Sequence, residues 1–274
     1  MRCHPNPRIV VMVPDVLPPY TAPLIAFMFG ACVGSFLNVC IYRIPKGKSI
    51  LFPGSSCPVC THGIPFYLNI PIVSYILLRG RCHHCHAPFS IRYPAVETLT
   101  ALAAMATAAQ FNITAQGGVW FTFVCTLIVI AFIDYDFQII PDIISLPGIP
   151  FFALASVLMG YHPWKASLAG ILMGGGSLYG VAMLYHFIRK EEGMGGGDIK
   201  LLAMIGGAIG WPGVLFTLFA GSVLGTLAGC VVMVIKRSVT PRLRIPFGPY
   251  LSMGAIAYIF KGKELIQWYF GLIY

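Results

Sequence analysis

The chain has 274 residues, of which 57% are hydrophobic and only 10% are charged, and its mean hydropathy is +0.80. Soluble domains carry about 25% charged residues, so this composition excludes an ordinary soluble protein. The net charge of +9 does not indicate a nucleic-acid partner, because the basic residues are spread over short loops and form no stripe beside aromatic residues. We therefore expect an all-α polytopic membrane protein.

The first twenty residues contain five prolines and no apolar core followed by a small-residue cleavage site. We interpret residues 1–20 as a short outer tail and not as a signal peptide. Apolar stretches of about 20 residues span a bilayer, and tilted or packed ones can be shorter. The chain after the tail predicts about eight transmembrane helices, at residues 21–43, 94–111, 118–137, 140–160, 166–188, 199–211, 213–235 and 247–260.

Lysine and arginine are distributed unevenly between the two sides of these predicted helices. If the first helix enters from outside, twelve basic residues lie on the inner side and five on the outer side. The positive-inside rule then places the loop after the first helix in the cytoplasm. The chain thus divides into the tail, a first transmembrane helix at 21–44, a cytoplasmic insertion at 45–93 and a larger transmembrane domain at 94–274.

The cytoplasmic insertion contains two Cys-x-x-Cys pairs, Cys57 with Cys60 and Cys82 with Cys85. Their separation of 21 residues is just beyond the spacing usual for a zinc ribbon. Four thiolates suit a structural zinc ion, which would replace the core that so short a segment lacks. The alternatives are disulfides, which a reducing cytoplasm disfavours, or free thiols. Neighbouring histidines are competing ligands that we interpret as solvated: His62, His83, His84 and His86.

Asp198 follows three glycines, Gly195, Gly196 and Gly197, and begins the sixth predicted helix. Glycine allows backbone conformations closed to other residues and close approach of a helix or ligand. An aspartate at a helix N-terminus is favoured by the helix dipole, so an ordinary N-cap is the alternative interpretation. The stretch lacks the register of a phosphate-binding loop. Glu191 and Glu192, just before it, are interpreted as solvated loop charges.

Asp134 lies in the last turn of the third predicted helix, where the dipole disfavours a carboxylate and no N-cap role exists. Two aspartates brought from two helices to one membrane depth share a proton, so that one acts as base and the other as acid. Such a pair activates water to attack a peptide bond. Asp136 lies about 200° around the helix from Asp134, and Asp142 follows Pro141 at a capping position, so we predict supporting roles for both.

Five segments, in order along the chain, resemble the type IV prepilin leader peptidases. The last one contains the Gly-x-Gly-Asp element of intramembrane aspartyl proteases at Gly195 to Asp198. They read GACVGSFLNVCIYRIP (30–45), NIPIVSYILLRGRCHHC (69–85), RYPAVETLTA (92–101), IDYDFQIIPD (133–142) and GMGGGDIKLLAMIG (193–206). The resemblance implies that Asp134 and Asp198 are the catalytic pair and that residues 94–274 form the peptidase domain.

The resemblance also implies substrates and a second activity. Members remove the short basic leader from type IV prepilins and type II secretion pseudopilins at the cytoplasmic face, after a glycine and usually before phenylalanine. Many members then methylate the new N-terminus with S-adenosylmethionine, and the four-cysteine insertion is similar to that of such bifunctional members. The expected location is a bacterial inner membrane, with the N-terminus outside and the insertion and catalytic aspartates on the cytoplasmic side.

Residues of the first helix and of the entry to the second are candidates for contact with substrate or methyl donor. They are Gly34, Ser35, Asn38, Arg43 and Glu97. For the small residues the alternative is helix packing. Glu97 is a charge one turn into an apolar helix, which favours a functional role. The sequence shows no soluble methyltransferase motif from which a donor site follows.

Two other classes of function compete with the enzyme. A transporter uses intramembrane carboxylates to relay protons, but inverted repeats with paired broken helices are not evident in the sequence. A scaffold that docks partners on the zinc-binding insertion leaves Asp134 without a role.

Overall fold

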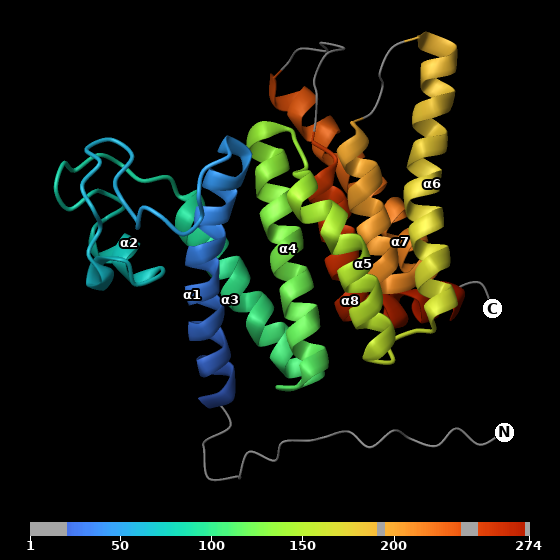
Figure 1. The fold of residues 1–274 in the computed structure, drawn as a ribbon, viewed down its shortest axis with the longest axis horizontal. Helices are drawn as coiled ribbons and strands as arrows, with labels where there is room; N and C mark the ends of the chain where they lie inside the picture. Colours follow the sequence, from blue (N-terminus) through green and yellow to red (C-terminus); the bar gives the residue numbers. More distant parts are fainter. Residues whose placement is uncertain (1–20, 191–194, 237–245, 272–274) are drawn as a thin grey trace.

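The computed structural model describes residues 21–190, 195–236 and 246–271. The predicted outer tail, Glu191 and Glu192 lie outside these residues. The described parts form helices without strands (Figure 1). The α-helices are α1 (Thr21–Arg43), α2 (Val73–Leu77), α3 (Arg92–Phe111), α4 (Ala115–Phe137), α5 (Asp142–Leu158), α6 (Trp164–Arg189), α7 (Gly196–Lys236) and α8 (Gly248–Gly271).

Most helices begin and end within a few residues of the predicted ranges. The short helix α2, which lies in the insertion, was not predicted, and the sixth and seventh predicted helices are joined in α7. Helix α8 continues to Gly271, well past its predicted end at residue 260. Four segments are long and apolar enough to cross a membrane, namely Thr21–Lys46, Ala115–Phe137, Trp164–Arg189 and Gly196–Ile235, while α5 is apolar but shorter. The chain is therefore an all-helical membrane protein, and a topology of eight spans stays a prediction.

Helix α7 turns back on itself. Its 41 residues would extend about 60 Å if straight, twice the thickness of a bilayer core. Gly210 interrupts it with φ 74° and ψ 174°, a conformation open mainly to glycine, and Pro212 follows. Both ends of α7 lie at the same end of the molecule in Figure 1, so α7 consists of two helices, as the two predicted ranges require.

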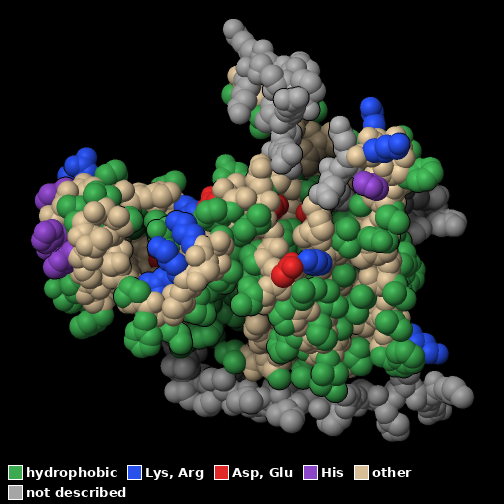
Figure 2. Space-filling view, turned by 45° about the horizontal axis from the view of Figure 1, so that its top comes forward, with side chains coloured by type: hydrophobic (Ala, Val, Ile, Leu, Met, Phe, Trp, Pro, Cys, Tyr) green, Lys and Arg blue, Asp and Glu red, His purple; other side chains and the backbone are tan. Residues whose placement is uncertain are grey.

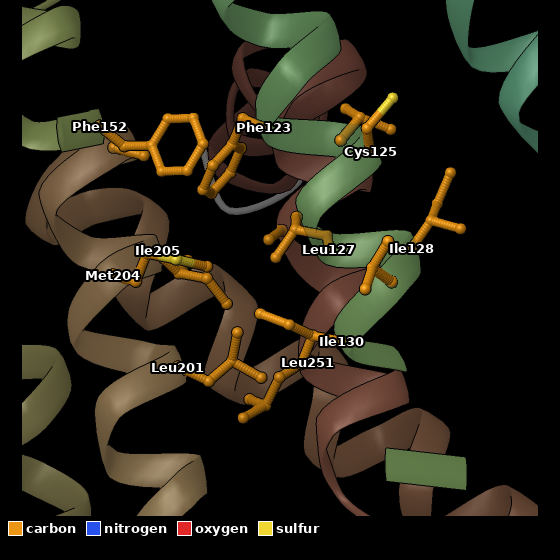
Figure 3. Close-up of a cluster of buried hydrophobic side chains, with 14 of the residues drawn as sticks. Phe123, Cys125, Leu127, Ile128, Ile130, Phe152, Leu201, Met204, Ile205 and Leu251 are labelled. Atoms are coloured by element: carbon orange, nitrogen blue, oxygen red, sulfur yellow. The ribbon is translucent and has the colours of Figure 1, made fainter. Parts of the chain in front are cut away.

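The outer surface of the bundle is apolar, and its interior is tightly packed. Figure 2 shows hydrophobic side chains covering the flank of the bundle; exposed examples are Phe187, Phe219 and Val234. Inside, α4 contributes a column of buried side chains that meets α5, α7 and α8 (Figure 3). The Phe123 and Phe152 rings lie edge to face with centroids 4.8 Å apart. Such packing holds helices together in lipid, where apolar burial alone gives little.

Glycines allow the closest helix contacts. On α1, Gly30 faces Ala101 and Ala104 of α3, and a Cβ at Gly34 would lie 2.7 Å from the Glu97 Cα. On α6, Gly170 meets the backbone of Gly206 in α7. Gly34 therefore has the helix-packing role given above as the alternative to ligand contact. Its contact also brings the start of α3 against α1.

The chain brings several helix ends to one end of the bundle. At the top of Figure 1 lie the C-terminal ends of α1 and α4, the N-terminal ends of α5 and α8, and both ends of α7. The insertion lies beside the upper part of α1 (Figure 1). The top is therefore where side chains from distant parts of the sequence meet.

Candidate functional site

Asp134 lies in the last turn of α4 and is only 6% exposed. Helix α4 ends at Phe137, and Gln138 adopts a left-handed conformation in which its N–H donates to the Asp134 carbonyl at 2.9 Å. The side chain has a different partner, because its Oδ2 accepts a hydrogen bond from the backbone N–H of Gly248 at 2.9 Å. The carboxyl group is thus held on one oxygen by the first residue of α8.

Asp198 lies in the first turn of α7 and is partly buried. It is near enough to Asp134 for direct repulsion between the two carboxylates. Two nearby carboxyl groups oppose each other's ionisation, which is the electrostatic condition for a pair that shares one proton. The structure therefore brings together the two aspartates on which the sequence analysis centred.

The three glycines before Asp198 differ in their surroundings. A Cβ at Gly197 would lie 2.8 Å from the Ile140 Cβ, whereas Gly195 and Gly196 face open space. Neither Gly196 nor Gly197 is among the described glycines with a φ in the left-handed region. The close approach is found only at Gly197, where it packs the start of α7 against the α4–α5 connection.

Asp136 and Asp142 each have a cationic partner. Asp136 forms an ion pair with Arg92 at the start of α3. Asp142 is the first residue of α5, and its Oδ1 lies 2.7 Å from the Nζ of Lys200 in α7. Asp142 was expected at a capping position, but the N-cap residue in the structure is Pro141. Asp142 lies in the first turn, where its negative charge interacts favourably with the helix dipole, and its ion pair links α5 to α7.

Gly248 was missed by sequence analysis. A Cβ at this residue would lie 2.7 Å from Asp134 Oδ2, so the position requires glycine as long as the hydrogen bond exists. The signal in the sequence is a Gly-Pro pair at the beginning of an apolar helix, Gly248 and Pro249. That pattern is common at helix starts and says nothing about a distant aspartate.

A cavity of about 390 Å³ lies between α1, α3 and the insertion. Its walls include Ser35, Asn38, Arg43 and Glu97, so four of the predicted contact residues share one site, and Gly34 packs behind it. Arg43 donates to the carbonyl oxygens of Ser49 at 3.0 Å and Pro53 at 2.6 Å, which fixes the first loop of the insertion.

The four insertion cysteines form one cluster. Their sulfur atoms all lie within 4.8 Å of one another, with Cys57 to Cys85 at 3.8 Å and Cys60 to Cys82 at 4.0 Å. A disulfide requires a sulfur–sulfur distance of about 2.05 Å, and all four cysteines are free in this structure. Tetrahedral coordination with metal–sulfur bonds of about 2.3 Å places sulfurs roughly 3.8 Å apart. The cluster therefore fits a tetrahedral metal ion.

Both halves of the cluster have the same backbone pattern. The N–H of Cys57 donates to the His62 carbonyl, and the N–H of Thr61 donates to the Cys57 carbonyl. The second half repeats these bonds from Cys82 to Ala87 and from His86 to Cys82. Within the described residues, the histidines are not among the clustered ligands, and the rings of His62 and His84 stack at 4.6 Å.

The surroundings of Cys57 lower the pKa of its thiol and so favour the thiolate. Backbone N–H groups of Cys60 and Val59 donate to it and, despite partial desolvation, lower the pKa of its thiol to about 6. Desolvation and hydrogen bonds with the other cysteines raise the pKa of the Cys60 thiol to about 11, so Cys57 is the one of this pair that is a thiolate at neutral pH, the form that metals bind.

Comparisons with known proteins agree with this arrangement. Residues 28–111 match the bacterial peptidase A24 N-terminal domain, and residues 121–230 match the type IV leader peptidase family. No solved structure matches the chain.

Relatives from several bacteria carry the name prepilin leader peptidase/N-methyltransferase. The protein from Pseudomonas putida is 33% identical over 88% of this chain and 91% of its own length. The one from Pseudomonas aeruginosa is 33% identical over 92% and 94%, and the one from Myxococcus xanthus 36% over 82% and 68%. The chain therefore belongs to the type IV leader peptidase family and is an enzyme of that family.

Proposed function

We propose that the chain removes the basic leader from type IV prepilins and type II secretion pseudopilins, after a glycine and usually before a phenylalanine. We further propose that it then methylates the new N-terminus with S-adenosylmethionine. The observation that carries the peptidase part is the meeting of Asp134 and Asp198 from two distant helices. The names of the relatives support both activities.

In the proposed reaction, the ionised aspartate removes a proton from water, and the oxygen of that water attacks the carbonyl carbon of the scissile bond. The protonated aspartate donates its proton to the carbonyl oxygen, which gives a neutral tetrahedral diol. Collapse of the diol breaks the carbon–nitrogen bond, and the leaving nitrogen takes up a proton from the aspartate that first accepted one. One diol hydroxyl gives its proton to the other aspartate as the carbonyl re-forms, which restores the starting protonation of the pair. Gly248 holds Asp134 in place through its N–H.

The proposed location is a bacterial inner membrane, with the aspartates at the cytoplasmic end and the N-terminus outside. Described lysines and arginines at the aspartate end support this orientation: Arg43, Lys46, Lys48, Arg189, Lys190 and Lys236. Lys165 lies near the opposite end. The apolar helix of a prepilin would then lie in the bilayer, with its basic leader in the cytoplasm.

In the proposed methylation, the neutral amine at the new N-terminus attacks the methyl carbon of the donor. The carbon–sulfur bond breaks, its electron pair stays on sulfur, and the methylated ammonium releases a proton to solvent or to a nearby carboxylate. The donor's positively charged sulfonium thereby becomes a neutral thioether.

We propose that the cysteine cluster holds a structural zinc ion. All four protein ligands are present and would fill a tetrahedral shell, which is typical of structural and not catalytic zinc. The ion would substitute for a core in the insertion, whose exposed apolar side chains include Phe52, Phe66 and Leu77.

The first prediction tests the aspartate pair. Asp134→Asn and Asp198→Asn should each lower the rate of leader removal by at least about 1,000-fold, because neither leaves a pair that can share a proton. The measurement is product mass over time with purified protein and a prepilin. Glu264→Gln makes the same carboxyl-to-amide change at an exposed residue of α8 and should cleave normally. Cleavage that survives either aspartate substitution would refute the assignment.

The second prediction concerns Gly248. Gly248→Ala places a Cβ against Asp134 Oδ2 and disrupts the hydrogen bond, so kcat for cleavage should fall about 10- to 100-fold. Gly225→Ala is the matched control, because its Cβ meets Tyr250 at an ordinary 3.4 Å. Equal kcat for the two variants would show that the Gly248 N–H does not position Asp134.

The third prediction concerns the metal. Elemental analysis of the purified protein should find about one zinc ion per chain, since four ligands make one site. Cys57→Ser and Cys82→Ser should lose most of the zinc, whereas Cys230→Ser, on α7 and outside the cluster, should retain it. Wild-type protein without stoichiometric zinc, or zinc that persists in both cluster variants, would contradict this site.

A further inference from the structure

The cavity between α1, α3 and the insertion contains polar groups that its protein walls do not satisfy. Asn38 is 3% exposed, and its side-chain nitrogen donates to the Tyr93 carbonyl at 3.0 Å. Its Oδ1 is buried and has no protein partner. A buried acceptor without a partner is costly, so this oxygen indicates a missing donor, from a ligand or from water.

Glu97 adds a buried carboxyl group to the wall of the same cavity. It is 8% exposed, and its Oε2 accepts a hydrogen bond from the N–H of Ile72 at 2.7 Å, with a further bond from Ser35. Ile72 has φ 63°, a strained conformation for a β-branched residue. The insertion therefore holds its backbone in an unfavourable conformation while it orients the Glu97 carboxyl at the cavity wall.

The other walls divide by chemical type. Aromatic rings of Tyr42, Phe52, Phe89 and Tyr93 provide flat apolar surface, and Arg43, Lys48 and Arg81 provide positive charge. Figure 2 shows lysine and arginine side chains gathered where the insertion meets the bundle. A ligand that fits these walls has a cationic group, a hydrogen-bond donor, a flat ring system and an anionic group.

We propose that this cavity binds the methyl donor, a proposal that rests on the methylation in the proposed function. S-adenosylmethionine combines an adenine ring, a sulfonium, an amino group and a carboxylate. The volume of about 390 Å³ is within the 300–1,000 Å³ usual for small-molecule sites. Glu97 faces the cationic part, Asn38 Oδ1 accepts from a ligand N–H or O–H, and the arginines and Lys48 attract the carboxylate.

The cavity lies close to the aspartate pair, as expected if the cleaved pilin moves from the aspartates to the methyl donor. Tyr93 lines the cavity, and its neighbour Arg92 pairs with Asp136, two residues after Asp134. The first turn of α3 thus borders both sites. Cys57 also lines the cavity, so the metal-binding cluster forms part of the wall. The insertion would therefore contribute to donor binding, a function that proteolysis alone does not require.

The test is donor binding by the full-length protein in detergent, without prepilin, measured by calorimetry with S-adenosylmethionine. Glu97→Gln and Asn38→Leu should each raise the Kd by more than tenfold, because the first removes the negative charge that faces the cationic part of the donor and the second removes the unpartnered acceptor. Glu264→Gln should bind like wild type. Light-induced cross-linking of radiolabelled donor, followed by peptide mapping, should label peptides that contain Tyr42 or Tyr93. Circular dichroism and thermal unfolding of the same preparations report whether each variant is folded.

The outcomes distinguish a failure of the proposed donor site from a failure of the proposed methylation. Wild type that methylates, with both variants binding the donor normally or with label outside the cavity, overturns the site and leaves the proposed function standing. Wild type that cleaves prepilin but neither binds the donor nor methylates overturns the methylation itself and the site with it. If one variant fails to cleave and is misfolded, the other variant and the cross-linked peptides decide.

Discussion

The arrangement depends on one constraint, which is that two carboxylates from helix ends 64 residues apart in sequence (198 − 134) must meet at the edge of an apolar bundle. Their mutual repulsion opposes this contact, so packing has to enforce it. Gly197 lets α7 start against Ile140, and Gly248 lets α8 start against Asp134. The two helices that begin at this site, α7 and α8, are thus each brought close by a glycine in the first turn.

Close packing elsewhere keeps these helix ends in register. The turn at Gly210 returns α7 to the end of the bundle from which it came, and the Gly170–Gly206 contact fixes α6 against it. On the other side of α4, the contact between α1 and α3 at Gly34 fixes where Glu97 and Arg92 lie along the bundle axis. The ion pair between Arg92 and Asp136 then joins the two halves of the molecule, which links the cavity beside the insertion to the aspartates.

Much of this was predictable from the sequence, for physical reasons. Hydropathy placed the long helices, and the dipole argument singled out Asp134 because a carboxylate at a helix C-terminus has no local explanation. The cysteine spacing predicted the cluster. What failed depends on tertiary contacts: Gly248 meets Asp134 only through folding, α2 is too short for a periodic pattern, and the ion partners of Asp136 and Asp142 come from other helices. The close approach predicted for the three glycines is found at Gly197, and which of the three it falls on also depends on a tertiary contact, with Ile140.

The central claim is that Asp134 and Asp198 act as one coupled acid–base pair. The most direct test is the dependence of kcat/KM for prepilin cleavage on pH, from about pH 4 to 9, with protein shown to stay folded across that range. The account predicts a bell-shaped profile, because activity is lost when both carboxyls are protonated and again when both are ionised. A profile that is flat across the acid range would contradict the pair.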